Sequence, residues 1–333
     1  MRRSGKEIIS KEIVCKLLEK LKNQNILVIG DSILDEYWEG KVDRISPEAP
    51  VPVFEYISTR KVLGGAANTA NNIRSLGGNV SLISLVGKDS NAKELIKLCN
   101  NSGINTEFIM NDNYRPTTTK TRVMVGKNQL LRIDQEVKTQ CRKSLSEQIL
   151  INVKRILKDY NAVVFSDYAK GVLSQELVKD IIVEAKSMGI KTFVDPVPST
   201  IDFYKGVDYI KPNKKETETY IAEYFEKDYS NAGEIIRLLN IKYKSNWIVT
   251  LGKDGMLFKN RNKCEIIHTF SKEVFDVSGA GDTAMAALAL SISAGNSLKE
   301  SIIFANICSG IVVGKIGTAT CTISDINNYL DMK

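Results

Sequence analysis

The chain has 333 residues, of which 43% are apolar and 26% charged, as expected for a globular protein that buries a complete core. Its single histidine, His268, excludes sites that need several imidazoles. The six cysteines form no CxxC pair, so we expect reduced thiols in a cytoplasmic protein rather than a disulfide framework.

The formal net charge of +7 is unevenly distributed along the chain. Residues 1–23 carry seven basic and three acidic side chains, so +4 lies there and only +3 remains for the rest. A nucleic-acid-binding protein more often shows a basic stripe on its body, so we expect no nucleic-acid partner.

Residues 6–22 place apolar side chains at helical spacing among charged ones, which is unlike a signal peptide. We therefore predict an N-terminal amphipathic helical extension, residues 1–23, that packs on the body or faces a partner. Residues 24–333 form one principal domain. The longest uncharged stretch, Thr283–Leu298, is short and rich in Ala, Ser and Gly, so it predicts a core helix and no membrane span.

Short apolar runs alternate with helical patterns along this domain, which predicts a doubly wound α/β fold with a mostly parallel sheet. The predicted strands are residues 25–30, 80–86, 162–165, 191–194, 209–210 and 247–251. The predicted helices are residues 65–76, 90–102, 144–158, 174–188 and 231–243.

Two segments, about 36–63 and 110–135, do not follow this alternation. Val51, Val53 and Phe54 in the first, and residues 117–134 in the second, have the β-branched, alternating pattern of exposed strands. We predict that the two segments form a small β-sheet lid beside the main sheet, able to exclude water from a reaction.

The most informative motif runs from Asp276 to Thr283 (DVSGAGDT) and precedes the predicted core helix. Gly279, Ala280 and Gly281 allow a turn whose amides bind an anionic oxygen at the helix N-terminus. Asp282 beside that site suits a base that takes a proton from an attacking hydroxyl, as phosphoryl transfer requires. A Gly turn with an N-capping Asp explains the spacing equally well. The stretch matches neither the Rossmann nor the P-loop pattern.

Other polar motifs follow predicted strands, where open α/β sheets bind ligands. Asp35 suits sugar hydroxyls or a cap, and Gly64-Gly65-Ala66-Ala67-Asn68 is a helix-start turn. Asn213 and Glu216 suit water around Mg²⁺, although their spacing alone favours a capping box. The turn from Thr250 to Gly252 contacts a nucleotide or is a plain hairpin turn, and Lys170 contacts a phosphate or lies on the surface.

The order of these motifs (GDxxLD, GGAAN, PNxxE, TLGxDG and DVSGAGD) resembles that of the ribokinase-like (PfkB) carbohydrate kinases over about residues 25–325. Arg44–Val53, Ser166–Gly171, and Thr117–Arg122 followed by Asn128–Asp134 resemble, more narrowly, the heptose 7-phosphate kinases. The central motif departs slightly, with Val277-Ser278 where the family often has Thr-X or Val-Thr.

The resemblance implies roles for individual residues. It makes Asp282 the catalytic base and Gly279, Ala280 and Gly281 the anion hole. It assigns the sugar to Asp35, Gly64, Gly65 and Asn68, Mg²⁺-bound water to Asn213 and Glu216, and ATP to Thr250, Gly252 and Asn306. From charge and position we add Arg122, Arg132 and Lys170 as contacts for the substrate phosphate.

The implied activity is ATP- and Mg²⁺-dependent phosphorylation of a heptose 7-phosphate at its 1-hydroxyl, on the route to ADP-heptose, a lipopolysaccharide or glycan precursor. Two alternatives stay open: a kinase for another sugar or sugar phosphate, such as a fructose phosphate, and a non-catalytic sugar-phosphate sensor. Many such kinases carry a nucleotidyltransferase domain with an HxGH motif; with His268 alone, we expect a separate adenylyltransferase. We also expect a homodimer, since lids often pair to cover a sheet edge.

Overall fold

The computed structural model describes residues 11–225, 232–260, 263–269, 277–315 and 317–331. Within them, nine strands form the main sheet, and parallel pairing runs from β11 to β5. Only the β11–β12–β13 edge is antiparallel. In spatial order the strands are β13 (Lys263–Ile267), β12 (Met256–Asn260), β11 (Asn246–Thr250), β10 (Tyr209–Ile210), β9 (Lys191–Asp195), β8 (Ala162–Ser166), β1 (Asn25–Gly30), β4 (Asn79–Val86) and β5 (Ile109–Asn111).

Helices cover both faces of this sheet, because alternate strand residues point to opposite sides. In β1, Ile26 and Val28 join one core while Leu27 and Ile29 join the other. The first core is closed by α1 (Lys11–Leu21), α2 (Ala66–Ser75), α3 (Ser90–Asn101), α8 (Ala280–Ser293), α9 (Leu298–Val312) and α10 (Ile323–Asp331). The second is closed by α4 (Lys143–Ile156), α5 (Gln175–Ser187), α6 (Lys214–Phe225) and α7 (Ala232–Tyr243). Short 3₁₀ helices lie at Leu157–Asp159 (η1), Pro198–Tyr204 (η2) and Gly252–Asp254 (η3).

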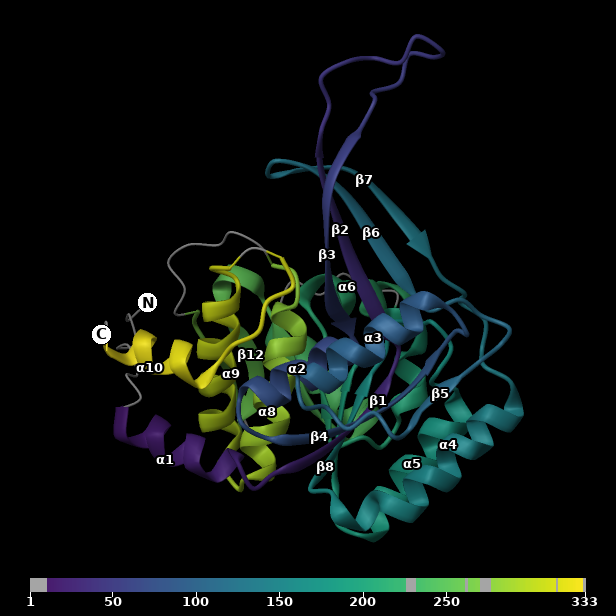
Figure 1. Cartoon of the computed structure of the whole chain (residues 1–333). Coiled ribbons are helices and arrows are strands. Elements are labelled where there is room, and N and C mark those ends of the chain that lie inside the picture. The colour runs from purple at the N-terminus through teal and green to yellow at the C-terminus, as the bar shows by residue number, and fades with distance from the viewer. Residues whose placement is uncertain (1–10, 226–231, 261–262, 270–276, 316, 332–333) are drawn as a thin grey trace.

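A separate four-stranded sheet stands away from the body (Figure 1). Its order is β3-β2-β6-β7, with β2 (Ser32–Lys41), β3 (Glu55–Gly65), β6 (Thr119–Val125) and β7 (Asn128–Gln135). We call it the lid. The predicted fold class, with its small second sheet, is confirmed.

The lid differs from the prediction in two places. Residues 110 and 111 belong to β5 at the edge of the main sheet. Val51, Val53 and Phe54 are not strand residues; they lie in the connection between β2 and β3, where only Ile45 and Pro52 form an isolated bridge. Prolines at 47, 50 and 52 explain this, since proline lacks the amide that a ladder needs.

The N-terminal helix packs on the body. Val14, Leu17, Leu18 and Leu21 of α1 are buried in the first core, at the helical spacing seen in the sequence. Residues 1–10, including the start of the predicted 6–22 helix, lie outside the described residues. None of the helices in the described part of the chain is both long and apolar enough to cross a membrane.

Candidate active site

The turn before α8 lies at the carboxyl-end side of the main sheet. Gly279 is the residue before the helix and has φ 78°, a left-handed conformation that favours glycine. A Cβ there would lie 3.1 Å from Asn68 Nδ2, so the position is also tight. Ala280, Gly281 and Asp282 form the first turn of α8. The Ala280 amide donates weakly to the carbonyl of Val277 at 3.3 Å, and amides at a helix N-terminus suit an anion. Asp276 lies outside the described residues.

Asp282 is the buried carboxylate of this turn, with 5% of its surface exposed. Its Oδ2 accepts a hydrogen bond from Asn68 Nδ2 at 2.7 Å. Its Oδ1 accepts two, from Thr69 Oγ1 at 3.0 Å and from Tyr168 OH at 2.7 Å. Burial raises the pKa of Asp282 from its usual 3.8 to about 6, and these donors oppose the rise. A carboxyl with this pKa is ionised at neutral pH yet ready to accept a proton.

Two further charged side chains stand beside the same turn. Lys211 Nζ and Asp195 Oδ2 form an ion pair of 2.8 Å. A Cβ on Gly281 would lie 3.6 Å from each of these atoms, so they border the space in front of the turn. Sequence reasoning did not assign a role to either residue; the available signal was their position, Asp195 as the last residue of β9 and Lys211 directly after β10.

The predicted sugar side is built by the lid and the start of α2. Asp35 on β2 pairs with Arg122 on β6, with Oδ1 and Nη1 2.6 Å apart, and accepts a hydrogen bond from Thr318 Oγ1 at 3.3 Å. A Cβ on Gly64 would lie 2.5 Å from Asp35 Oδ2, so any other residue would displace that carboxylate, and Gly65 has φ 57°, which favours glycine. Asn68, four residues after Gly64, donates to Asp282 and so links the predicted sugar side to the α8 turn.

Basic side chains gather near the base of the lid, and each predicted one is already paired. Arg122 pairs with Asp35, Arg132 with Asp134, and Lys170 with Glu136 at 2.7 Å. Arg132 is half-exposed and directly opposite Arg122 in the β6–β7 ladder, whereas Lys170 is buried.

Lys120 joins this group, although sequence reasoning missed it. Burial lowers the pKa of Lys120, and the nearby charges of Lys170 and Arg132 lower it further, against the opposing charge of Asp134, whose Oδ2 lies 3.9 Å from Lys120 Nζ. Its spacing of two from Arg122 on a strand puts both side chains on one lid face, which is the signal that could have found it.

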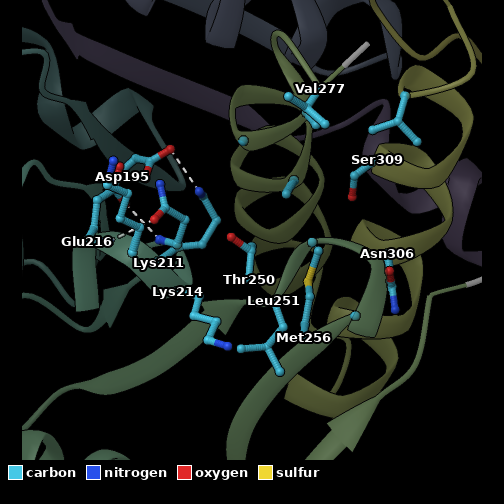
Figure 2. Close-up of a pocket in the computed structure, with 18 of the residues that line it drawn as sticks. Asp195, Lys211, Lys214, Glu216, Thr250, Leu251, Met256, Val277, Asn306 and Ser309 are labelled. Atoms are coloured by element: carbon cyan, nitrogen blue, oxygen red, sulfur yellow. Dashed lines mark hydrogen bonds and ion pairs between the residues drawn. The ribbon is translucent and has the colours of Figure 1, made fainter. Parts of the chain in front are cut away.

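A pocket of about 940 Å³ opens beside the α8 turn, and Asp195 and Lys211 line it (Figure 2). Ala280 and Gly281 line it, and so do the residues predicted for ATP (Thr250, Gly252 and Asn306) and for Mg²⁺-bound water (Asn213 and Glu216). Its volume and its mixture of apolar and polar walls suit a nucleotide.

Within this pocket, Leu251, Met256 and Ala284 supply apolar wall, and Lys211 and Lys214 supply positive charge. Asn306 Nδ2 donates to the carbonyls of Ile267 and His268 at 2.9 Å, so it holds the end of β13 against α9.

Asn213 and Glu216 form the capping box that the spacing favoured. Glu216 N donates to Asn213 Oδ1 at 2.8 Å, and Asn213 N donates to Glu216 Oε2 at 2.7 Å. Burial and the charge of Asp195 raise the pKa of Glu216. The second oxygen of Glu216 is outside this exchange, and oxygen donors suit Mg²⁺ held through water. In the described residues, no three His, Cys, Asp or Glu side chains form a metal cluster.

Comparison with known proteins agrees with this geometry. Residues 23–325 match the model of the pfkB family carbohydrate kinases. The chain is 42% identical over 307 residues to the bifunctional protein HldE of Sulfurimonas denitrificans, covering 91% of this chain and 64% of that protein. It is 38% identical over 304 residues to the bifunctional protein HldE of Helicobacter pylori, covering 91% and 65%. This chain thus spans a little under two thirds of these relatives' length.

Solved structures share the fold at lower identity. Phosphofructokinase-2 from Escherichia coli, crystallised with potassium, has a TM-score of 0.75 and 18% identity, covering 92% of this chain and 99% of its own. Ribokinase from Thermotoga maritima has a TM-score of 0.72 and 22% identity, covering 92% and 99%. Together with the family match, the relatives and the shared fold show that the chain belongs to the pfkB family of carbohydrate kinases.

Proposed function

We propose that the protein phosphorylates the anomeric 1-hydroxyl of a heptose 7-phosphate with ATP, giving heptose 1,7-bisphosphate for ADP-heptose synthesis. The observation that carries the proposal is the position of Asp282. This buried carboxylate directly follows Gly281 and accepts a hydrogen bond from Tyr168, both of which line a nucleotide-sized pocket, and it accepts another from Asn68 on the predicted sugar side. The similarity to the bifunctional HldE proteins supports the choice of sugar.

In the proposed reaction, Asp282 takes the proton of the sugar hydroxyl. A carboxylate accepts about four hydrogen bonds. Oδ1 already has two donors and Oδ2 has one, so the free acceptor position is on Oδ2. The hydroxyl oxygen attacks the γ-phosphorus as its proton passes to Oδ2, and the bond to the leaving ADP breaks.

The amides of the α8 turn act on the transferring group. Gly279, Ala280 and Gly281 present backbone N–H groups at the positive end of a helix, where the transition state concentrates negative charge. Lys211 stands beside the same space and adds a positive charge. Asn213 and Glu216 would hold Mg²⁺ through water, and that ion supplies charge neutralisation on the ATP phosphates.

Four basic residues are proposed for the 7-phosphate: Lys120, Arg122, Arg132 and Lys170. Their present carboxylate partners lie on the lid and its flanking segment, so a phosphate binds by exchanging these ion pairs for new ones. Asp35 is then released from Arg122 and is free to accept a sugar hydroxyl. Closure of the lid over the sugar limits transfer of the phosphoryl group to water.

We also propose a cytoplasmic homodimer paired through the lids. Leu131 and Ile133 alternate with Arg132 along β7, so they lie on the opposite lid face, and they are 57% and 45% exposed. Trp38 and Tyr56, in edge-to-face contact, belong to the same sheet. A second lid would cover this apolar surface and the exposed strand edge.

The test is a substrate panel with coupled detection of ADP. Heptose 7-phosphate is expected to give the highest kcat/KM, with fructose 6-phosphate and unphosphorylated hexoses well below it, and ³¹P NMR is expected to place the new phosphate on C1. Preference for fructose 6-phosphate would favour the alternative kinase, and no turnover on any sugar would favour the sensor. The D282N variant is the control for contaminating kinases.

A further inference from the structure

One side chain of the loop after β8, that of Tyr168, contacts the proposed base Asp282. Tyr168 is two residues past the end of β8, and its hydroxyl donates to Asp282 Oδ1 at 2.7 Å. It is the donor to this carboxylate that does not come from α2. Burial and the charge of Asp282 raise the pKa of Tyr168 well above its usual 10, so the hydroxyl keeps its proton at working pH.

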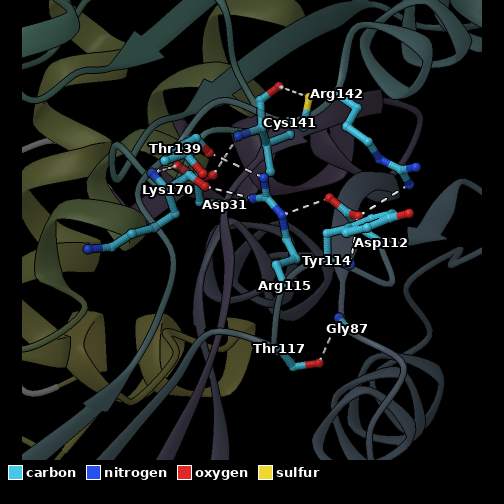
Figure 3. Close-up of polar contacts among 11 residues, drawn as sticks. Asp31, Gly87, Asp112, Tyr114, Arg115, Thr117, Thr139, Cys141, Arg142 and Lys170 are labelled. Atoms are coloured by element: carbon cyan, nitrogen blue, oxygen red, sulfur yellow. Dashed lines mark hydrogen bonds and ion pairs between the residues drawn. The ribbon is translucent and has the colours of Figure 1, made fainter.

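The loop that carries Tyr168 is held by Asp31, directly after β1, and Figure 3 shows Asp31 beside Lys170 of this loop. Asp31 is buried and accepts hydrogen bonds from the amides of Tyr168 and Lys170 at 3.0 Å and of Val172 at 3.1 Å. Ala169 between them has φ 52°, an unusual value for a residue with a Cβ, and its amide donates to the Asp167 side chain at 2.8 Å.

The same loop is tied to the base of the lid. Arg115, just before β6, donates from Nη1 to the carbonyl of Lys170 at 2.8 Å and from Nη2 to that of Thr139 at 3.3 Å. Asp112 fixes Arg115 through Nε at 3.1 Å and also pairs with Arg142 at 3.3 Å (Figure 3). Both ends of the β6–β7 hairpin therefore meet the Tyr168 loop, whose position is determined from two sides.

We infer that Tyr168 is a positioning residue that orients the Asp282 carboxylate and keeps it ionised for its role as base. The inference rests on the proposed function, in which Asp282 accepts the sugar proton. By saturating Oδ1 together with Thr69, the Tyr168 hydroxyl directs the incoming proton to Oδ2. Because it donates to the charged form of Asp282, it opposes the effect of burial on that carboxyl.

The other groups that face Asp282 do not replace this contribution. From α2, Asn68 and Thr69 are neutral donors. The charge of Asp195, the last residue of β9, disfavours ionisation of Asp282, but this charge is offset by Lys211, after β10. Asp35 on β2 is neutralised by Arg122 on β6. Loss of the Tyr168 hydroxyl thus leaves Oδ1 with Thr69 alone.

The experiment compares Y168F with the matched control Y204F. Tyr204 also donates at 2.7 Å to a buried carboxylate, that of Asp167, which is not the proposed base. In Y168F, we expect the acid limb of kcat/KM to move up by about one to two pH units, with activity recovering at high pH and the KM for ATP within about twofold. In Y204F, the limb is expected to stay where it is in the wild type.

Two further measurements separate this inference from the proposed function. Carboxyl ¹³C NMR of Asp282, identified by its absence in D282N, reports the same upward shift without turnover, so it decides the matter even if no sugar is phosphorylated. 3-Fluorotyrosine at position 168, a stronger donor of nearly the same shape, should move the limb down and covers the case in which Y168F fails to fold. An unmoved limb with activity lost equally at every pH, or an equal shift in Y204F, would overturn the inference.

Discussion

Replacing Asp282 by asparagine should make the protein more stable at neutral pH while removing its activity. The carboxylate is buried, and its pKa is raised from 3.8 to about 6. A folded-state pKa above the unfolded value means that the folded protein binds the proton more tightly. Raising the pH from below 3.8 to above about 6 therefore destabilises the wild type. D282N has no ionisable group at this position, so it does not lose this stability.

The magnitude follows from the size of the shift. A rise from 3.8 to about 6 corresponds to about 3 kcal/mol of lost stability once the group is fully ionised, and about 2 kcal/mol of it falls between pH 4.5 and pH 8. In D282N an amide nitrogen replaces one carboxylate oxygen and faces one of the three present donors. The lost hydrogen bond lowers the free energy of unfolding by about 1–3 kcal/mol. That cost is independent of pH, so the difference between the two pH values is the quantity to measure.

Urea unfolding at pH 4.5 and pH 8 provides the assay, with D180N as the control. Asp180 lies exposed on α5, and the same chemical change there should shift neither curve. The stability of D282N relative to the wild type is expected to increase by about 2 kcal/mol between the two pH values. Parallel pH dependences for D282N and wild type would show that burial of this carboxylate costs the fold nothing, which would refute the reasoning.

Three other predictions test separate parts of the site. G281V places a side chain 3.6 Å from Lys211 Nζ and Asp195 Oδ2. We expect kcat to fall by about 100-fold or more while the thermal unfolding temperature stays near that of the wild type. Retained turnover would argue against an anion hole there. R122Q should raise the KM for the sugar phosphate about tenfold or more without changing that for ATP, and an unchanged KM would exclude Arg122 from the phosphate site. L131D should convert a lid-paired dimer to monomer in sedimentation experiments, and sedimentation like that of the wild type would contradict pairing through this face.

The sequence predicted local backbone features and the alternation of elements, because both leave short-range patterns. The glycines at 64, 65 and 279 are required by close contacts or by positive φ, and such requirements leave a local signature. The strand and helix alternation likewise follows from burial of both sheet faces. The spacing of Asn213 and Glu216 predicted the start of α6, but its extent was not predicted because its apolar residues are few, with Tyr220 and Ile221 supplying its buried hydrophobic surface.

Contacts that depend on the spatial order of the strands could not be predicted from the sequence. Asp195 and Lys211 are 16 positions apart, and they meet because β9 and β10 are neighbours. Tyr168 and Asp282 are 114 positions apart and meet only in the folded protein. The spacing of Asn213 and Glu216 is ambiguous for a different reason: it fits both a capping box, which the structure contains, and the proposed site for Mg²⁺-bound water.

The way the lid joins the body has a consequence for how substrate preference changes during evolution. One residue separates β1 from β2, and β3 runs directly into α2. The lid is therefore joined without a linker to elements that border the proposed catalytic centre. Nevertheless, Lys120, Arg122 and Arg132 are on lid strands, whereas the α8 turn and the nucleotide pocket belong to the body. Under the proposed function, substitutions on these two strands, β6 and β7, therefore recruit a new sugar while the phosphoryl-transfer apparatus is inherited intact, and exchanging lid strands between family members offers a direct route to redesigning specificity.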